Sequence, residues 1–397
     1  MVEWKEYRIK DLGEVVTGNT PPTSNREYYG TEYKFIKPTD MVEGQRFVST
    51  TEEYYSELAY QKYKKCLLPP KTPCVVTIGS LGKKMCLTDT ECFTNQAVNA
   101  VIPNKENDGE FLYYAFKASV LAYVKQLDSG TTSGRENVSK SSFSKIKVRV
   151  PPLPTQQKIA SILSAYDNLI QNYKKQIEAL QTAASELYKE WFVRFRFPGY
   201  QTTKFENGIP EGWKVEKLFD VAKIIYGYPF NSDEFCDDSS LNPVVRIRDI
   251  LDNYTNTYTS ETCDEKYWIN PNEMLIGMDG IFHMSLWTGK RALQNQRTVR
   301  VTSKVKNLSN YYLYFSLYPQ IKALEQMIVG TTVAHLGDKH IKKITILIPE
   351  DKILKMSFER LEPIMNRIYS LQQQITNLTQ QRDLLLPRLM SGKLEVE

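Results

Sequence analysis

The hydrophobic positions between Thr155 and Trp191 recur in alternating steps of four and three residues, without interruption. This a/d heptad pattern predicts a long helix with one continuous apolar seam. The segment contains no glycine, and Pro154 stands at its start, where a helix tolerates proline. At about 1.5 Å per residue, the helix would be about 55 Å long. Such a seam needs a partner helix.

A second heptad segment near the C-terminus supplies that partner. Its seam residues Ile375 and Leu385 follow Ile177 and Leu187 at a constant offset of 198 residues. Ser357 and Arg382 occupy positions where the pattern expects apolar side chains, and Pro363 and Pro387 are expected to bend or end the helix. We predict that the two helices pack through the seam residues Leu163, Tyr166, Ile170, Tyr173, Ile177, Leu180, Leu187, Ile364, Ile368, Leu371, Ile375, Leu378 and Leu385.

The segments before the two helices also repeat one another. The stretch that begins at Trp4 matches the stretch that begins at Trp213, and Lys37 and Asp40 align with Arg246 and Asp249 at the same offset of 209. The shared pairs 95–96 (Asn-Gln) and 295–296, and the Gly-Thr-Thr motifs at 130–132 and 330–332, align at an offset of 200. The chain is therefore an internal duplication. Its expected parts are a domain at 1–152, a helix at 153–197, a domain at 198–350 and a helix at 351–397.

Each repeated domain has a mixed, mainly β pattern, so we expect an α+β fold. Short apolar runs predict strands at 34–37, 74–78, 97–102 and 145–150, and at 244–247, 274–277, 298–302 and 343–348 in the second copy. One helix per domain is expected, at 110–127 and at 310–328.

The loops between these strands are rich in Asn, Gln, Ser, Thr, Lys and Arg, which pair with base edges and phosphates. Polar loops of this kind are also ordinary protein surface. The two copies keep the strand positions and differ in the loops, as two readers of different targets would. Because both copies share Asn95-Gln96 and Asn295-Gln296, we favour a structural role for these pairs.

Composition narrows the function further. The chain has 397 residues, 41% of them hydrophobic, and a formal charge of +5, a mild basic bias compatible with nucleic acid. Six cysteines without close pairing and three histidines argue against a metal site. Walker A, dinucleotide-binding and nucleophile-elbow motifs are missing, so we expect no catalytic residues. The N-terminus lacks an apolar signal region, and we expect a cytoplasmic protein with reduced thiols.

Four stretches carry a resemblance to a known family. They are PLPTQQKIASILSAYD at 152–167, EWFVRFRFPG at 190–199, PEGWKVEKLFDVA at 210–222 and LLLPRLMSGKLE at 384–395. Together they resemble the specificity subunit of type I restriction-modification systems over essentially the whole chain. The second helix departs from the pattern, because PEDKILKMSFERLEP replaces the Pro-Leu-Pro-x-Gln-Gln start.

The resemblance implies two target-recognition domains that each read half of a bipartite DNA site, with antiparallel helices as a spacer. It implies a non-catalytic subunit that recruits two DNA methyltransferase (modification) subunits, which use S-adenosylmethionine, and restriction subunits that hydrolyse ATP. A coiled-coil scaffold or a DNA-binding adaptor outside restriction is the alternative. The candidate DNA contacts are Asn19, Thr20, Lys37, Ser80, Lys83, Lys84, Thr132, Arg135 and Asn137 in the first domain, and Asn231, Arg246, Arg248, His283, Lys290, Arg291, Thr332 and His335 in the second.

Overall fold

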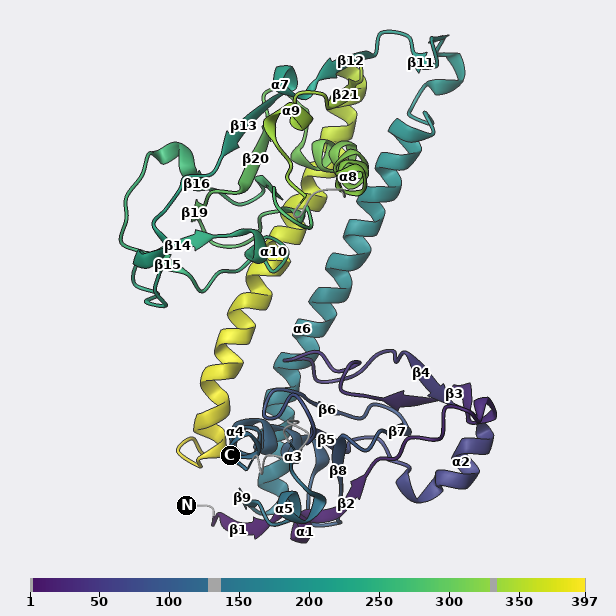
Figure 1. The fold of residues 1–397 in the computed structure, drawn as a ribbon, viewed down its shortest axis with the longest axis vertical. Coiled ribbons are helices and arrows are strands. Elements are labelled where there is room, and N and C mark those ends of the chain that lie inside the picture. The colour runs from purple at the N-terminus through teal and green to yellow at the C-terminus, as the bar shows by residue number, and fades with distance from the viewer. Residues whose placement is uncertain (1–2, 128–136, 329–333, 397) are drawn as a thin grey trace. The chain divides into compact units, whose positions relative to one another are not determined.

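The computed structural model describes residues 3–127, 137–328 and 334–396 (Figure 1). The chain forms two compact units, the first made of Met1–Gln171 with Asn377–Glu397 and the second of Asn172–Thr376. Each unit therefore contains one sheet-rich domain together with a portion of both long helices. The helices are not separate from the domains, because each domain buries part of its core against them.

The first unit is built on two sheets. A four-stranded antiparallel sheet has the order β2-β8-β5-β6, and a three-stranded sheet has the order β4-β3-β7. The pair β1-β9 ties the N-terminus to the strand that leads into the first long helix. The strands are β1 (Lys5–Arg8), β2 (Gly13–Thr17), β3 (Tyr29–Ile36), β4 (Glu53–Tyr55), β5 (Pro73–Val76), β6 (Met85–Leu87), β7 (Cys92–Thr94), β8 (Val98–Pro103) and β9 (Lys147–Val150).

Short helices cover these sheets. They are α1 (Ile9–Leu12), α2 (Glu57–Tyr63), α3 (Gly109–Ala115), α4 (Leu121–Gln126) and α5 (Lys140–Ser144), with a π turn (Phe116–Val120) between α3 and α4. The Asp108 carboxylate accepts a hydrogen bond from the backbone N–H of Phe111 at 2.8 Å and so begins α3. Every residue of α3 except Glu110 is buried, and Phe111 and Phe116 join the first heptads of the long helix in one core.

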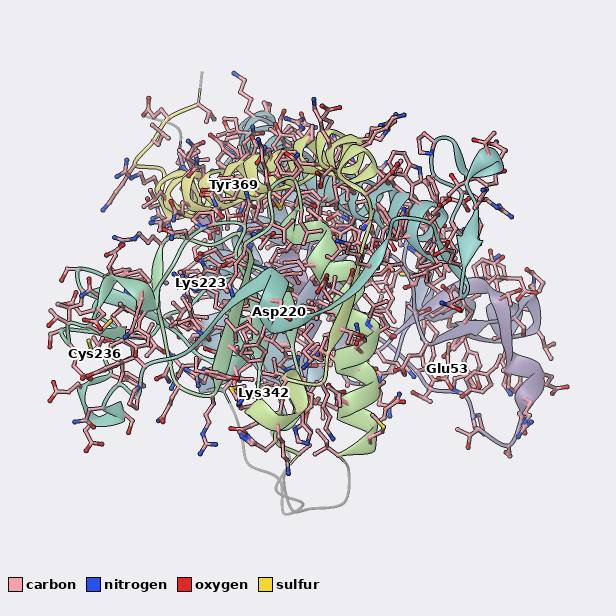
Figure 2. All side chains as sticks on the ribbon, turned by 90° about the horizontal axis from the view of Figure 1, so that it is seen from above. Glu53, Asp220, Lys223, Cys236, Lys342 and Tyr369 are labelled. Atoms are coloured by element: carbon pink, nitrogen blue, oxygen red, sulfur yellow. The ribbon has the colours of Figure 1, made fainter. Side chains whose placement is uncertain are left out.

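The second unit repeats this plan. Its sheets have the orders β13-β20-β17-β18 and β15-β14-β19-β16, with the pairs β12-β21 and β10-β11. In Figure 2, Lys223 lies on β13 of the first sheet, and Cys236 lies at the far edge beside the second. The strands are β10 (Phe205–Glu206), β11 (Ile209–Pro210), β12 (Lys214–Lys217), β13 (Ala222–Tyr226), β14 (Asn242–Val245), β15 (Tyr258–Thr259), β16 (Trp268–Ile269), β17 (Met274–Gly277), β18 (Met284–Leu286), β19 (Ala292–Gln294), β20 (Thr298–Ser303) and β21 (Thr345–Ile348); the helices are α7 (Leu218–Val221), α8 (Asn310–Met327) and α9 (Asp338–Ile341).

The predicted α+β fold and internal duplication are confirmed. Each of the eight expected strands overlaps an observed one, and both expected domain helices are present. The repeat extends to single hydrogen bonds: Asp40 accepts from the backbone N–H of Lys37 at 2.7 Å, and Asp249 accepts from that of Arg246 at 2.9 Å. These shared aspartates therefore close the turn after β3 and after β14, which explains why both copies have one.

The two long helices are α6 (Leu153–Tyr188) and α10 (Asp351–Met390). Helix α6 ends earlier than the expected 197 and passes into a π turn (Lys189–Val193). In the first unit Asp167 contacts Arg382, and in the second Gln176 contacts Arg367. Because α6 positions rise while their α10 partners fall, the helices run antiparallel. All predicted seam residues are buried or half-buried.

The prolines of the second helix do not act as expected. Pro363 and Pro387 both lie inside α10, which continues through them to Met390. Both are exposed, so the carbonyl groups that lose their helical donor face water and remain hydrated. The polar seam positions are also accommodated. Ser357 donates its hydroxyl to the carbonyl of Leu354 at 2.8 Å, and Arg382 forms an ion pair.

Candidate nucleic-acid interface

Several loops of the first unit meet at one end of its four-stranded sheet. The backbone N–H of Asn19, just after β2, donates to the carbonyl of Thr94 at 2.9 Å. The N–H of Thr77, just after β5, donates to the carbonyl of Ala97 at 2.8 Å, and the N–H of Val138 donates to the carbonyl of Thr77 at 2.8 Å. Backbone bonds therefore hold the loops after β2, β5 and β7 and the segment at 138 side by side.

The second unit has the same backbone frame. The N–H of Tyr228 donates to the carbonyl of Gln294 at 2.9 Å, and the N–H of Met278 donates to the carbonyl of Arg297 at 2.9 Å. The N–H of Leu336 then donates to the carbonyl of Met278 at 2.7 Å. One frame thus presents two different sets of loop side chains. We call the end of each unit at which these loops meet the loop end.

In the first unit, most of the described candidate residues lie at the loop end. Ser80 and Lys83 are exposed in the turn between β5 and β6, and Thr20 is exposed after β2. Asn137 pairs with Ile78 through an isolated β-bridge, which brings it to the same turn. Three further candidates at this end, Asn19, Lys37 and Lys84, are half-buried.

Two lysines of the first unit are already engaged. The Lys37 ammonium lies 3.0 Å from a carboxylate oxygen of Glu52 and 3.2 Å from one of Glu53. Partial burial opposes the charged form, but these carboxylates raise the pKa of Lys37. The Lys84 ammonium donates to the carbonyl of Pro38 at 2.8 Å. A phosphate would have to compete with these groups, so Lys83 is the more accessible cation.

In the second unit, four candidates lie at the loop end. Arg246 and Arg248 follow β14, His283 belongs to the β17–β18 loop, and His335 bridges to Asp279. The Arg246 guanidinium donates to the hydroxyl of Thr257 at 2.9 Å, whereas the Arg248 side chain is 63% exposed.

Lys290 and Arg291 lie away from the loop end. Both precede β19, so they lie at the opposite end of that strand from the loop end. The Arg291 guanidinium stacks 4.3 Å from the ring centroid of Trp268 and pairs with Glu265. The carbonyl of Lys290 accepts from the indole N–H of Trp287 at 2.8 Å. This arrangement fits a role in packing the second sheet.

Asn231 is also displaced from the loop end. Its backbone N–H donates to Glu261 at 2.8 Å, beyond β15 and near the start of β14. Its side-chain oxygen accepts from the backbone N–H of Asp233 at 3.2 Å, so Asn231 begins a turn. Three other candidates, Thr132, Arg135 and Thr332, lie outside the described residues, as do both Gly-Thr-Thr motifs.

In each shared Asn-Gln pair, the asparagine bonds to the sheet and the glutamine is exposed. The backbone N–H of Asn95 donates to the carbonyl of Ile36 in β3 at 3.2 Å, and that of Asn295 donates to the carbonyl of Val245 in β14 at 3.1 Å. The Asn95 side chain also accepts from the N–H of Ala97 at 3.1 Å. Gln96 and Gln296 are exposed at the tip of the turn, and Gln96 hydrogen-bonds the hydroxyl of Thr20.

The sequence analysis missed Arg297. Its Nε lies 3.6 Å from one carboxylate oxygen of Asp279, and the other oxygen lies 2.6 Å from Nδ1 of His335. This cluster sits at the loop end of the second unit. The offset of 200 places Arg297 opposite Ala97, and this contrast between the copies could have identified it.

Other kinds of site find no support in the part of the chain that the structure describes. No group of three or more His, Cys, Asp or Glu side chains there is arranged to hold a metal ion. Among those same residues, no helix combines the length and apolar character that crossing a membrane requires.

The duplicated sheets, the paired helices and the divergent loop ends define a two-part recognition protein. The family model described as the type I restriction modification DNA specificity domain matches residues 1–182 and 210–380, once per repeat. The chain belongs to this family. The assignment confirms the expected specificity subunit and does not favour the coiled-coil scaffold.

Relatives of full length support the assignment. The chain is 30% identical to the type I restriction enzyme MjaIX specificity subunit of Methanocaldococcus jannaschii, over all of this chain and 94% of that protein. It is 26% identical to the MjaVIII specificity subunit of the same organism, with the same coverage. The S subunit of a type I system from M. genitalium has the same fold, with a TM-score of 0.65 at 16% identity over 98% of this chain and 96% of that one.

Proposed function

We propose that this chain selects DNA for a type I restriction-modification complex by reading a bipartite site, one half with each loop end. The single observation that carries the proposal is the repeated backbone frame with different side chains. The bonds at Thr77 and Met278 join the same pair of loops in each unit, while the residues on these loops differ in charge and shape. A conserved support with variable contacts suits two readers of different half-sites.

The chemistry of the loop ends suits DNA. Asn137 can hydrogen-bond adenine through two atoms, and Arg248 can bind guanine or phosphate. Lys83 supplies a point charge for the phosphate backbone, which contributes affinity that weakens with salt. The net charge of +5 is small, so binding by the isolated chain should be weak and the modification subunits should complete the contact with DNA.

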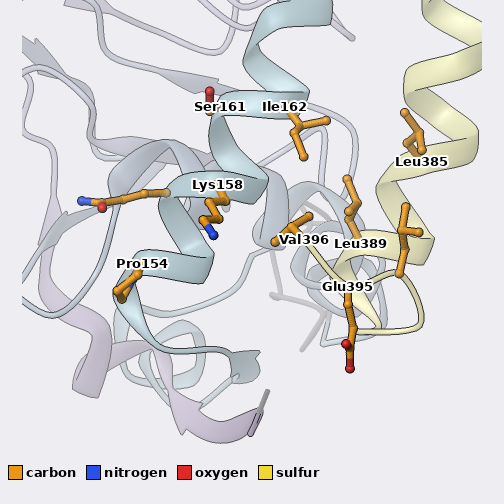
Figure 3. A pocket seen from close by; sticks show the side chains of 10 residues that line it. Pro154, Lys158, Ser161, Ile162, Leu385, Leu389, Glu395 and Val396 are labelled. Carbon is orange, nitrogen blue, oxygen red and sulfur yellow. The ribbon is translucent and has the colours of Figure 1, made fainter. Parts of the chain in front are cut away.

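The long helices would set the distance between the half-sites and hold the partner subunits. In the first unit a groove of about 670 Å³ lies between the start of α6 and the end of α10 (Figure 3). Ile162 and Leu385 face one another across it. Ile162 is 37% exposed and the neighbouring Leu384 is 64% exposed. Exposed apolar side chains in such a cluster are typical of a protein interface, and we assign this one to a modification subunit.

The reaction chemistry belongs to the partners in this proposal. The methyl donor, S-adenosylmethionine, would bind the modification subunits, and ATP would bind the restriction subunits. This chain contributes the choice of sequence and the spacing.

The proposal is tested by expressing the chain with its modification subunit and mapping methylated adenines in the host DNA by single-molecule sequencing. The expected result is one bipartite motif that disappears when the chain is omitted. Replacing residues 1–150 with the same domain of a relative should change one half of the motif only. A change in both halves would show that the two units read DNA jointly.

A further inference from the structure

The two units differ sharply in charge at three matched positions of the loop end. The backbone frame makes these positions equivalent, because the same bonds fix them in both units. The second unit has three ionisable side chains there, and the first has none. The matched pairs are Asp279 and Ile78, Arg297 and Ala97, and His335 and Asn137.

In the second unit, the Asp279 carboxylate lies between the side chains of His335 and Arg297. His335 holds one oxygen of Asp279 at 2.6 Å, and the other oxygen faces Nε of Arg297 at 3.6 Å. The Arg297 side chain is 60% exposed, and its terminal Nη atoms make no hydrogen bond to any residue that the structure describes. The Asp279 carboxylate attracts one edge of the guanidinium, and the Nη atoms are left for a ligand.

Arg297 is not needed to hold the fold. An ion pair this exposed contributes little to stability, and the bond from Met278 uses only the backbone carbonyl of Arg297. Its φ of 65° is a left-handed conformation that most side chains avoid. The residue therefore occupies a locally unfavourable conformation, and most of its side chain is exposed.

We infer that Arg297 is a specificity-determining residue of the second unit and binds a guanine in its half-site, with Asp279 as its positioning residue. A guanidinium donates two parallel hydrogen bonds to O6 and N7 of guanine, the commonest specific contact in the major groove. The Asp279 carboxylate, 3.6 Å from Nε, attracts that edge of the guanidinium and favours a fork that points away from it. The first unit, with Ala97 at this position, makes no such contact. This inference rests on the proposed function.

The test uses the full chain in complex with its modification subunit. Methylated motifs are mapped for the wild type and for R297A, D279N and, as a matched control, R196A. Arg196 has the same exposed side-chain fraction as Arg297, 60%, and follows the π turn at the end of α6 rather than belonging to the loop end. We expect R297A to accept other bases at one guanine of the second half-site, with about 10- to 100-fold less discrimination there. D279N should relax the same position to a smaller degree, and R196A should keep the wild-type motif.

A second measurement separates a base contact from a phosphate contact. Binding of the same complexes is measured on DNA that carries 7-deazaguanine at the affected position, which removes the N7 acceptor. The analogue should weaken wild-type binding by at least several-fold and leave R297A binding unchanged. An equal loss for both proteins, or an R297A variant that weakens binding on all sequences alike, would overturn the inference. A wild-type complex without any bipartite motif would overturn the proposed function itself, and this inference with it.

Discussion

A polar layer in the helix pair of the first unit offers a quantitative test of the duplicated architecture. Nη1 of Arg382 lies 2.6 Å from Oδ1 of Asp167, and both side chains are only 11% exposed. The hydroxyl of Tyr114 donates to Oδ2 of Asp167 at 2.5 Å. Burial, together with this carboxylate, raises the pKa of Tyr114. The two buried charges of this layer therefore face one another, the neutral Tyr114 hydroxyl donates to the carboxylate, and Asp383 and Lys117 lie nearby.

The second unit builds the equivalent layer without charge. Met365 lies 198 residues after Asp167, and Ala184 lies 198 residues before Arg382. Phe315 stands six residues after the α8 cap, as Tyr114 stands six residues after the α3 cap. These three residues belong to one apolar cluster. The protein itself thus supplies the apolar replacement for the polar layer.

The contacts of this layer set the expected changes in the free energy of unfolding. Among the described residues, R382A leaves the buried Asp167 with Tyr114 as its one hydrogen-bond donor, and breaking a buried ion pair costs about 3–5 kcal/mol. Arg382 also contacts the half-exposed Asp383, so we expect the lower value, about 3 kcal/mol. The double variant D167M/R382A removes both charges but leaves the Tyr114 hydroxyl without its acceptor, a loss of about 1–2 kcal/mol. Adding Y114F should bring the triple variant within about 1 kcal/mol of the wild type.

Urea unfolding of the full chain measures these energies, with amide hydrogen exchange in α3 as the report on the first unit and in α8 as the internal reference. The control is R367A, an exposed arginine of the same helix, which should change stability by less than about 0.5 kcal/mol. A cost below about 1 kcal/mol for R382A, or a triple variant as unstable as R382A, would show that the layer is not a coupled, buried pair.

Three further outcomes are expected. Gln176 and Arg367 face one another in the second unit, and one heptad is inserted after Gln176 and another before Arg367. The gap between methylated half-sites should lengthen by about three base pairs, since seven helical residues add about 10 Å and each base pair about 3.4 Å. An unchanged gap in an active variant would exclude the helices as the spacer. Stability to urea should fall as the pH rises above about 10, because burial raises the pKa of several tyrosines and the folded protein then holds more protons than the unfolded protein. These tyrosines are Tyr55, Tyr113, Tyr114, Tyr311 and Tyr312. Burial lowers the pKa of Lys117, and this single described lysine opposes the effect of the five tyrosines. L384E should reduce co-purification of the modification subunit without changing the unfolding temperature, whereas V215E on the equally exposed β12 should leave the complex intact.

Much of the fold could be predicted because its signals are periodic or repeated. The heptad of α6 extends over many turns, and each turn repeats the same apolar positions. The repeat, whose offset is 209 residues at Trp4 and Trp213 and 200 at the Asn-Gln pairs, tests each strand twice, since a run missed in one copy can be found in the other. Asp40 and Asp249 were visible as a shared pair for the same reason, and both proved to close a turn.

The loop ends were harder to predict, because composition does not say at which end of a strand a residue lies. Arg291 is basic and close to Asn295 in sequence, yet β19 separates them and carries them to opposite ends. Arg297 was overlooked because its partner Asp279 is 18 residues earlier in the chain. Only the sheet register, in which Gly277 of β17 pairs with Thr298 of β20, brings the two together.

The imperfect heptad pattern of α10 shows that the sequence of one helix does not predict how its polar seam positions are accommodated. Ser357 and Arg382 interrupt the seam in the same way in the sequence, but they differ in what they require. Ser357 satisfies its hydroxyl within its own helix turn. Arg382 needs a carboxylate from the other helix, and Asp167 lies 215 residues away. A heptad assigns positions within one helix, whereas an ion pair also fixes which layer of the partner it faces. The buried charge therefore specifies the antiparallel register of the first unit, which the apolar layer of Ala184 and Met365 does not do for the second.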